Sequence, residues 1–190
     1  MMERSSRFLS LSGLAGILAG TYALVGAFVA HTLLKFRPTE IGYSAEGLTP
    51  QELRNLLILA GIVLVLSVGS AIWLSYKRSL KREESFWNAT SRKLVYQMGI
   101  PLATGGVLLL VMMVQGLTGL LAPMTLIFYG LSLYNAGLLS YHEVKSLGLI
   151  QVAFGLISAA LIEYQLLFWA AGFGVMHIVY GILIHLKYER

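Results

Sequence analysis

Long uncharged apolar runs alternate with short polar segments along the whole chain. Six of these runs reach the length of about 20 residues that an α-helix needs to cross the hydrocarbon core of a bilayer. Helices are the expected structure, because a membrane-spanning backbone has to satisfy its own hydrogen bonds. The predicted spans are 8–34, 56–76, 94–115, 119–140, 146–163 and 166–186. They predict an all-α, polytopic integral membrane protein, with residues 1–190 forming a single compact bundle of six transmembrane helices.

The composition supports a membrane protein and removes several kinds of chemistry. Hydrophobic residues make up 57% of the chain and charged residues only 12%, about half of the roughly 25% found in soluble domains. The chain contains no cysteine, and all of its acidic residues are glutamate, which excludes disulfides, thiolate metal sites and aspartyl-phosphate chemistry. The sequence also has no metalloprotease, phosphate-loop or nucleophile-elbow motif. We therefore expect no enzymatic activity, no metal and no cofactor.

The basic residues predict an orientation with both termini in the cytoplasm, because cytoplasmic segments are enriched in Lys and Arg. With the N-terminus inside, the outer segments hold only Lys35, Arg37 and Arg54. The inner segments hold Arg4, Arg7, Lys77, Arg78, Lys81, Arg82, Arg92, Lys93, Lys145, Lys187 and Arg190. The net charge of +5 is thus explained by orientation and by anionic lipid headgroups on the cytoplasmic side, without nucleic acid as a partner.

The connections predict which helices are neighbours. The segments 116–118, 141–145 and 164–165 are so short that helices three to six must be consecutive antiparallel neighbours. The longer outer loop, 35–55, ends in Thr49-Pro50-Gln51-Glu52, a capping box that predicts a helix start near Pro50. The inner loop, 77–93, mixes basic residues with aromatic ones, which favours a short interfacial helix.

Small residues recur at helical spacing on several spans, and helices in a bilayer associate through close contacts of this kind. The first span carries the longest stripe, so we expect another helix to lie closely against it. Its members are Ser12, Gly16, Ala19, Ala23, Gly26 and Ala30. A comparable stripe on the sixth span consists of Ala170, Gly174, His177 and Gly181.

The few polar residues inside the predicted spans provide the candidate sites. Gln97, Asn135 and Gln151 lie at similar heights in the cytoplasmic third, with Tyr180 not far off, and can form one hydrogen-bonded layer. Two interpretations stay open for this layer: routine interhelical packing, or the lining of a path for substrate or water. His177 lies near the midplane between glycines, as either a packed neutral imidazole or a group that lines a cavity.

A second polar group lies near the outer boundary and contains His31, Gln115 and Glu163. Water is available at this depth, so ordinary boundary residues are one interpretation. The other is an acid–base pair formed by Glu163 and His31.

Two stretches carry a resemblance: Leu133-Tyr134-Asn135-Ala136, and the run from Phe168 to His177. The chain resembles small bacterial six-helix inner-membrane proteins that have no assigned activity. This resemblance implies a location in the bacterial inner membrane, and it implies no reaction or ligand.

Three functions compete on these observations. The small-residue packing and sparse polar interior favour a non-enzymatic membrane component that binds or scaffolds a partner, either another protein or a second copy of the chain. The polar layer favours a small transporter or carrier, since six helices suit a three-plus-three inverted repeat. A membrane enzyme acting on lipid is the third hypothesis and depends on Glu163 and His31.

Overall fold

The computed structural model describes residues 13–36, 49–81, 83, 85 and 87–188. Within these residues the protein is all-helical. The elements are α1 (Gly13–Thr32), α2 (Pro50–Lys81), α3 (Ala89–Val114), the 3₁₀ turn η1 (Thr118–Leu120), α4 (Leu121–Gly137), α5 (His142–Ala160), the 3₁₀ turn η2 (Ile162–Tyr164), α6 (Gln165–Trp169), the π-helix η3 (Ala170–Met176) and α7 (His177–Tyr188). We call the continuous segment from η2 to α7, Ile162–Tyr188, the sixth span. Six helices among the described residues are long and apolar enough to cross a membrane, as the sequence predicted.

The helix ends agree with the capping signals. Helix α2 begins at Pro50, and the backbone N–H of Thr49 donates to Glu52 Oε2 at 2.8 Å while the N–H of Glu52 donates to Thr49 Oγ1 at 3.2 Å. This is the predicted capping box. At the start of α3, Asn88 Oδ1 accepts a hydrogen bond from the N–H of Ser91 at 2.9 Å.

Several helix boundaries differ from the prediction. Helix α2 continues to Lys81 and α3 begins at Ala89, and the described residues between them (83, 85, 87 and 88) are not helical. The described part of the inner loop therefore contains no separate interfacial helix, and the rest of that prediction lies outside the described residues. Helix α5 begins at His142, four residues before the predicted span, because charged residues can extend a helix beyond the apolar run. The first predicted span starts at residue 8, and the part before Gly13 lies outside the described residues.

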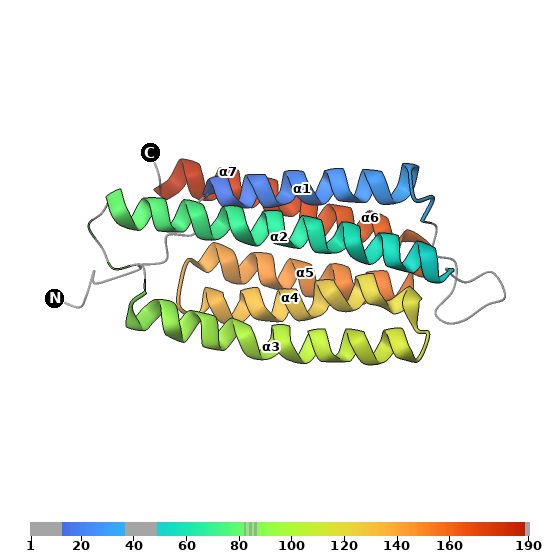
Figure 1. The fold of residues 1–190 in the computed structure, drawn as a ribbon. Coiled ribbons are helices and arrows are strands. Elements are labelled where there is room, and N and C mark those ends of the chain that lie inside the picture. The colour runs from blue at the N-terminus through green and yellow to red at the C-terminus, as the bar shows by residue number, and fades with distance from the viewer. Residues whose placement is uncertain (1–12, 37–48, 82, 84, 86, 189–190) are drawn as a thin grey trace.

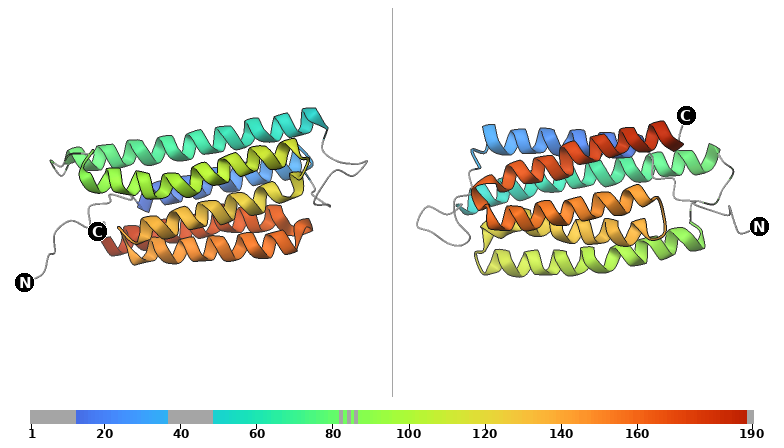
Figure 2. Two further views of the ribbon diagram at one scale, coloured as in Figure 1. Left: turned by 90° about the horizontal axis from the view of Figure 1, so that it is seen from below. Right: turned by 180° about the vertical axis from the view of Figure 1, so that it is seen from behind.

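The helices form two layers, shown one above the other in Figure 1. The first layer consists of α2, α1 and the sixth span, and the second consists of α5, α4 and α3. Neighbouring helices follow one another in the order α2, α1, sixth span, α5, α4, α3, and the two further views in Figure 2 agree with this order. The contacts between the layers run mainly from the sixth span to α4 and α5.

Glycines bring the backbones together inside each layer. In the first layer a Cβ added at Gly20 would lie 2.6 Å from the carbonyl oxygen of Gly174, and one added at Gly16 would lie 3.1 Å from that of His177. In the second layer a Cβ at Gly130 would lie 2.7 Å from the Gly148 carbonyl oxygen. The expected close neighbour of α1 is therefore the sixth span, and α4 and α5 form an equally close pair.

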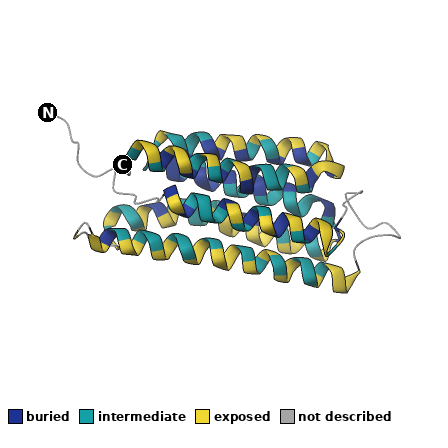
Figure 3. Ribbon diagram, turned by 90° about the horizontal axis from the view of Figure 1, so that it is seen from above, coloured by how far each residue is buried: buried dark blue, intermediate teal, exposed yellow. Residues whose placement is uncertain are grey.

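Helices α2 and α3, the first and last in this order, expose most of their residues, and Figure 3 colours exposed positions yellow. Helix α2 is 32 residues long, about 48 Å at 1.5 Å per residue, and among them only Ser79 is buried. It rests on α1 near Gly26, where an added Cβ would lie 2.7 Å from Val63 Cγ2. Its apolar surface suits contact with lipid or with another transmembrane helix.

Candidate functional site

The main polar cluster of the interior is built around His177, which is buried on the sixth span. Tyr129 of α4 lies on one side of the imidazole, with 2.9 Å between its hydroxyl oxygen and His177 Nε2. Gln151 of α5 lies on the other side, with its Nε2 3.4 Å from His177 Nδ1. Each of the three residues is near the middle of its own candidate span, so the cluster joins three helices at one depth. We call these three residues the central cluster.

The backbone of the π-helix η3 completes this cluster. The carbonyl oxygen of Gly172 accepts a hydrogen bond from Gln151 Nε2 at 2.8 Å and lies 3.0 Å from His177 Nδ1. A Cβ at Gly172 would lie 2.5 Å from Gln151 Oε1, so the glutamine approaches this closely because residue 172 is glycine. Short π-helical segments inside α-helices frequently occur at functional sites.

The hydrogen bonds select one tautomer of His177. Gly172 offers only a carbonyl acceptor to Nδ1, so Nδ1 carries the proton, and Nε2 then accepts the proton of the Tyr129 hydroxyl. In this arrangement the Gln151 amide also donates to Gly172, and its buried carbonyl oxygen Oε1 has no hydrogen-bond partner within the described part of the chain. The central cluster therefore presents a free amide oxygen in an interior where such groups are normally satisfied.

Aromatic rings lie beside the imidazole. The Phe173 ring lies 5.9 Å from that of His177, nearly parallel to it, and 5.0 Å from those of Tyr129 and Trp169. Aromatic surface next to a few convergent polar groups is the usual composition of small-molecule sites between helices.

The central cluster carries no fixed charge. Helix α4 and the segment Gln165–Met176 contain no Asp, Glu, Lys or Arg. Among the described residues no group of three His, Cys, Asp or Glu side chains is placed to hold a metal ion. The arrangement can hydrogen-bond an uncharged molecule or exchange a proton at the imidazole.

The structure divides the four residues that were expected to form one polar layer. Gln151 joins His177, because α5 begins earlier than predicted and its middle falls at residue 151. Asn135 Nδ2 instead donates to the backbone carbonyl of Gln97 at 3.3 Å, which links α4 to α3. The buried side-chain oxygens of Gln97 and Tyr180 have no hydrogen-bond partner among the described residues.

The three residues expected near the outer boundary are all exposed. His31 lies in the last turn of α1, Gln115 caps α3 and Glu163 lies in η2. The hydrogen bonds within the described part of the chain do not join them to one another. An acid–base pair of Glu163 and His31 stays a prediction that gains no support from this geometry.

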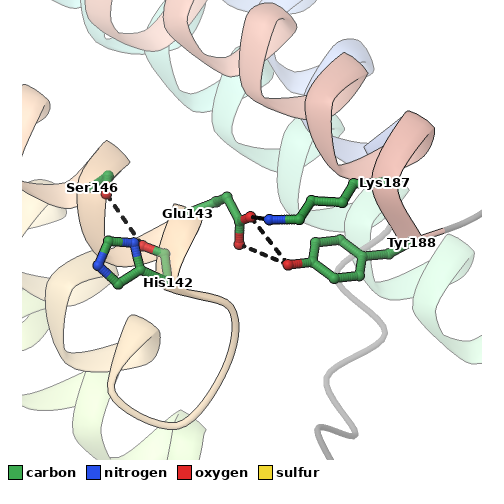
Figure 4. Close-up of polar contacts among 5 residues, drawn as sticks. All are labelled: His142, Glu143, Ser146, Lys187 and Tyr188. Carbon is green, nitrogen blue, oxygen red and sulfur yellow. Dashed lines mark hydrogen bonds and ion pairs between the residues drawn. The ribbon is translucent and has the colours of Figure 1, made fainter.

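A further polar group lies at the opposite end of the bundle and was not predicted from the sequence. Figure 4 shows Glu143 at the start of α5 facing Lys187 and Tyr188 at the end of α7. The Lys187 ammonium forms an ion pair with Glu143, and the Tyr188 hydroxyl donates to Glu143 at 3.0 Å. The Tyr141 and Tyr188 rings stack 4.2 Å apart. These contacts connect α5 to the sixth span at the end of the bundle that the basic residues predict to face the cytoplasm.

Three further residues escaped sequence reasoning. Tyr129 lies in an apolar run where an aromatic residue is unremarkable. Ser158 and Gln165 lie near predicted helix ends, where polar residues are common, yet both are fully buried. The one available signal was the spacing of seven residues between Gln151 and Ser158, which places both on one face of α5.

Comparison of the chain with protein-family models, with curated proteins and with solved structures found no match. The proposals below therefore depend on the geometry and chemistry of this chain.

Proposed function

We propose that this chain is an integral membrane protein that carries a small polar solute through its helix bundle, with the central cluster as the binding site. The observation that carries the proposal is His177, a buried imidazole in the middle of the sixth span that is hydrogen-bonded from α4 and packed beside α5. Ionisable side chains at this depth in membrane helices are rare, and they usually mark a substrate or proton pathway.

The surroundings of His177 favour a binding site over simple packing. A packing contact needs one hydrogen bond between two helices, whereas here side chains from three helices converge on one carbonyl and one ring. The π-helix lies at the same place, and the site is at the contact between the two layers. In transporters, substrate sites near the midplane between two helix groups allow alternating access when one group moves against the other.

The proposed location is supported by the sequence. The excess of basic residues favours an orientation with the Tyr188 end of the sixth span in the cytoplasm, next to anionic headgroups. The resemblance to bacterial inner-membrane proteins favours that membrane.

A second candidate function is a membrane component that binds a partner through α2. Its support is the exposure of α2, which packs on α1 and buries only Ser79 among its 32 residues. A helix of this length with so little buried surface offers a full face to another transmembrane helix.

Native mass spectrometry of the protein extracted in mild detergent separates the two candidates. The carrier predicts a discrete non-lipid small molecule bound to the wild-type protein and to the variant His142→Leu, whose histidine is exposed. The variant His177→Leu, checked for folding by thermal unfolding, is expected to lose that molecule. The purified protein in liposomes should then take up the same compound.

Two results would contradict the carrier: a wild-type protein that holds no small molecule, or a folded His177→Leu variant that retains it. A stoichiometric additional protein in the spectrum would support the second candidate instead.

A further inference from the structure

Two polar side chains near the η2 end of the bundle are buried and have no hydrogen-bond partner in the part of the chain that the structure describes. Ser158 of α5 and Gln165 of α6 both have no exposed surface, with 0% relative accessibility. Among the described residues no hydrogen-bond partner is found for Ser158 Oγ, Gln165 Nε2 or Gln165 Oε1. Since buried polar groups are nearly always hydrogen-bonded, this pair is an exception that needs an explanation.

The behaviour of Ser158 differs from that of comparable hydroxyls in this protein. Serine and threonine in apolar helices usually donate to the carbonyl three or four residues earlier. Ser132 donates in this way to Phe128 O at 2.9 Å, and Ser140 to Ala136 O at 2.8 Å. Ser158 is as fully buried as Ser132, but its hydroxyl forms no such bond to a described residue. The hydroxyl is therefore available to a molecule outside its own helix.

The spacing of residues along the two helices predicts that Ser158 lies opposite Gln165. Helix α5 and the sixth span are antiparallel neighbours, and the Gln151 side chain contacts Gly172 directly. Seven residues forward from Gln151 is Ser158, and seven residues back from Gly172 is Gln165. Seven residues are about two helical turns, so the second pair lies on the same faces, roughly 10 Å nearer to η2.

We propose that Ser158 and Gln165 form a second polar site, through which a small uncharged solute passes between the η2 end and the central cluster. A hydroxyl and a carboxamide offer both donors and acceptors and carry no charge, so the matching ligand is a small neutral molecule with a hydroxyl or amide group, accompanied by water. The inference rests on the proposed carrier function, since it names the access route and the substrate class of the same pathway. Gln151 Oε1, seven residues nearer to the central cluster along α5, is also buried without a hydrogen-bond partner among the described residues.

The absence of native cysteine permits a direct test by single-cysteine labelling. The variant Ser158→Cys is nearly isosteric, and Ser132→Cys is a matched control because Ser132 is equally buried and hydrogen-bonded to Phe128 and Met98. The probe is 2-hydroxyethyl methanethiosulfonate, a small neutral reagent with a hydroxyl group. Because only the thiolate reacts, and it forms only in contact with water, Ser158→Cys should react at least about tenfold faster than Ser132→Cys. Adding Gln165→Leu to the Ser158→Cys protein should remove most of this difference.

The result that would overturn the second site is equal, slow labelling of Ser158→Cys and Ser132→Cys in folded protein, when both react fully after denaturation. Thermal unfolding of each variant establishes that the folded proteins are being compared. Failure of the proposed carrier function is recognised by a different result, namely a wild-type protein that binds no small molecule. Fast labelling of Ser158→Cys in that case would leave a water-accessible polar site that does not serve a carrier.

Discussion

His177 has partners on both ring nitrogens, so its hydrogen bonds can be removed one at a time. The variant Tyr129→Phe removes the hydroxyl that donates to Nε2 and leaves the ring contact with Phe173 in place. We expect it to lower the free energy of unfolding by about 1 kcal/mol, because a buried acceptor is left unpaired. Reversible unfolding in mixed detergent micelles measures this change.

The matched control for Tyr129→Phe is Tyr164→Phe, because Tyr164 is an exposed tyrosine in η2. Loss of the exposed Tyr164 hydroxyl should leave the free energy of unfolding unchanged. Equal effects of the two substitutions would show that the bond between Tyr129 and His177 contributes no stability.

At the scale of single residues, the sequence indicated His177 but not its surroundings. A histidine between glycines in an apolar run is visible in the sequence, whereas Tyr129 is one of several tyrosines in such runs. The depth of Gln151 was misjudged because it was counted from the end of the apolar run, and α5 begins four residues before that run. Which residues of two different helices meet depends on how each helix is rotated about its own axis. Apolar periodicity defines this rotation poorly when all faces of a helix are apolar.

The glycines of the helices fall into two classes that predict opposite effects of substitution. A Cβ at Gly181 would overlap the carbonyl oxygen of Gly13 and lie 2.7 Å from the backbone nitrogen of Ile17. Gly181→Ala should therefore force α1 and α7 apart and cost about 1–3 kcal/mol, as overpacking does elsewhere. At Gly61 of α2 an added Cβ meets nothing within 4 Å, so Gly61→Ala should be neutral or slightly stabilising.

Thermal unfolding of Gly181→Ala and Gly61→Ala side by side tests this contrast. A Gly181→Ala protein as stable as the wild type would mean that the close backbone contact of α1 and α7 is not required.

At the scale of elements, local signals were reliable and helix distortions were not. The capping box of Thr49 and Glu52 located the start of α2 because its hydrogen bonds lie within four residues. The stripe on the first span predicted a close partner, and Ala23, Gly26 and Ala30 are buried, although Gly13 and Gly20 form the closest contacts and were not in the predicted stripe. The π-helix η3 packs mainly on α1 and also on α5, and such contacts between distant segments leave no local pattern in the sequence.

At the scale of the whole molecule, the short loops predicted the order of the helices in the second half of the chain. The three tight connections required α3, α4, α5 and the sixth span to be consecutive neighbours, and the structure confirms this order. The position of α1 between α2 and the sixth span was not predictable in the same way. Its contact with the sixth span joins residues near opposite ends of the chain, and only the small-residue stripes on both helices indicated it.

The orientation in the membrane gives a prediction for the whole molecule. Eleven basic residues on the predicted cytoplasmic side face three on the other, and each contributes roughly 1 kcal/mol of attraction to an anionic surface. A cysteine introduced at Gln115, which is exposed at the end of α3, should therefore react with a membrane-impermeant maleimide in intact cells. The matched variant His142→Cys, exposed at the opposite end of the bundle, should react only after the membrane is permeabilised. The reverse pattern would place the Ser158 and Gln165 site on the cytoplasmic side and invert the direction of access to His177. Labelling of both cysteines in intact cells would indicate that the chain inserts in both orientations.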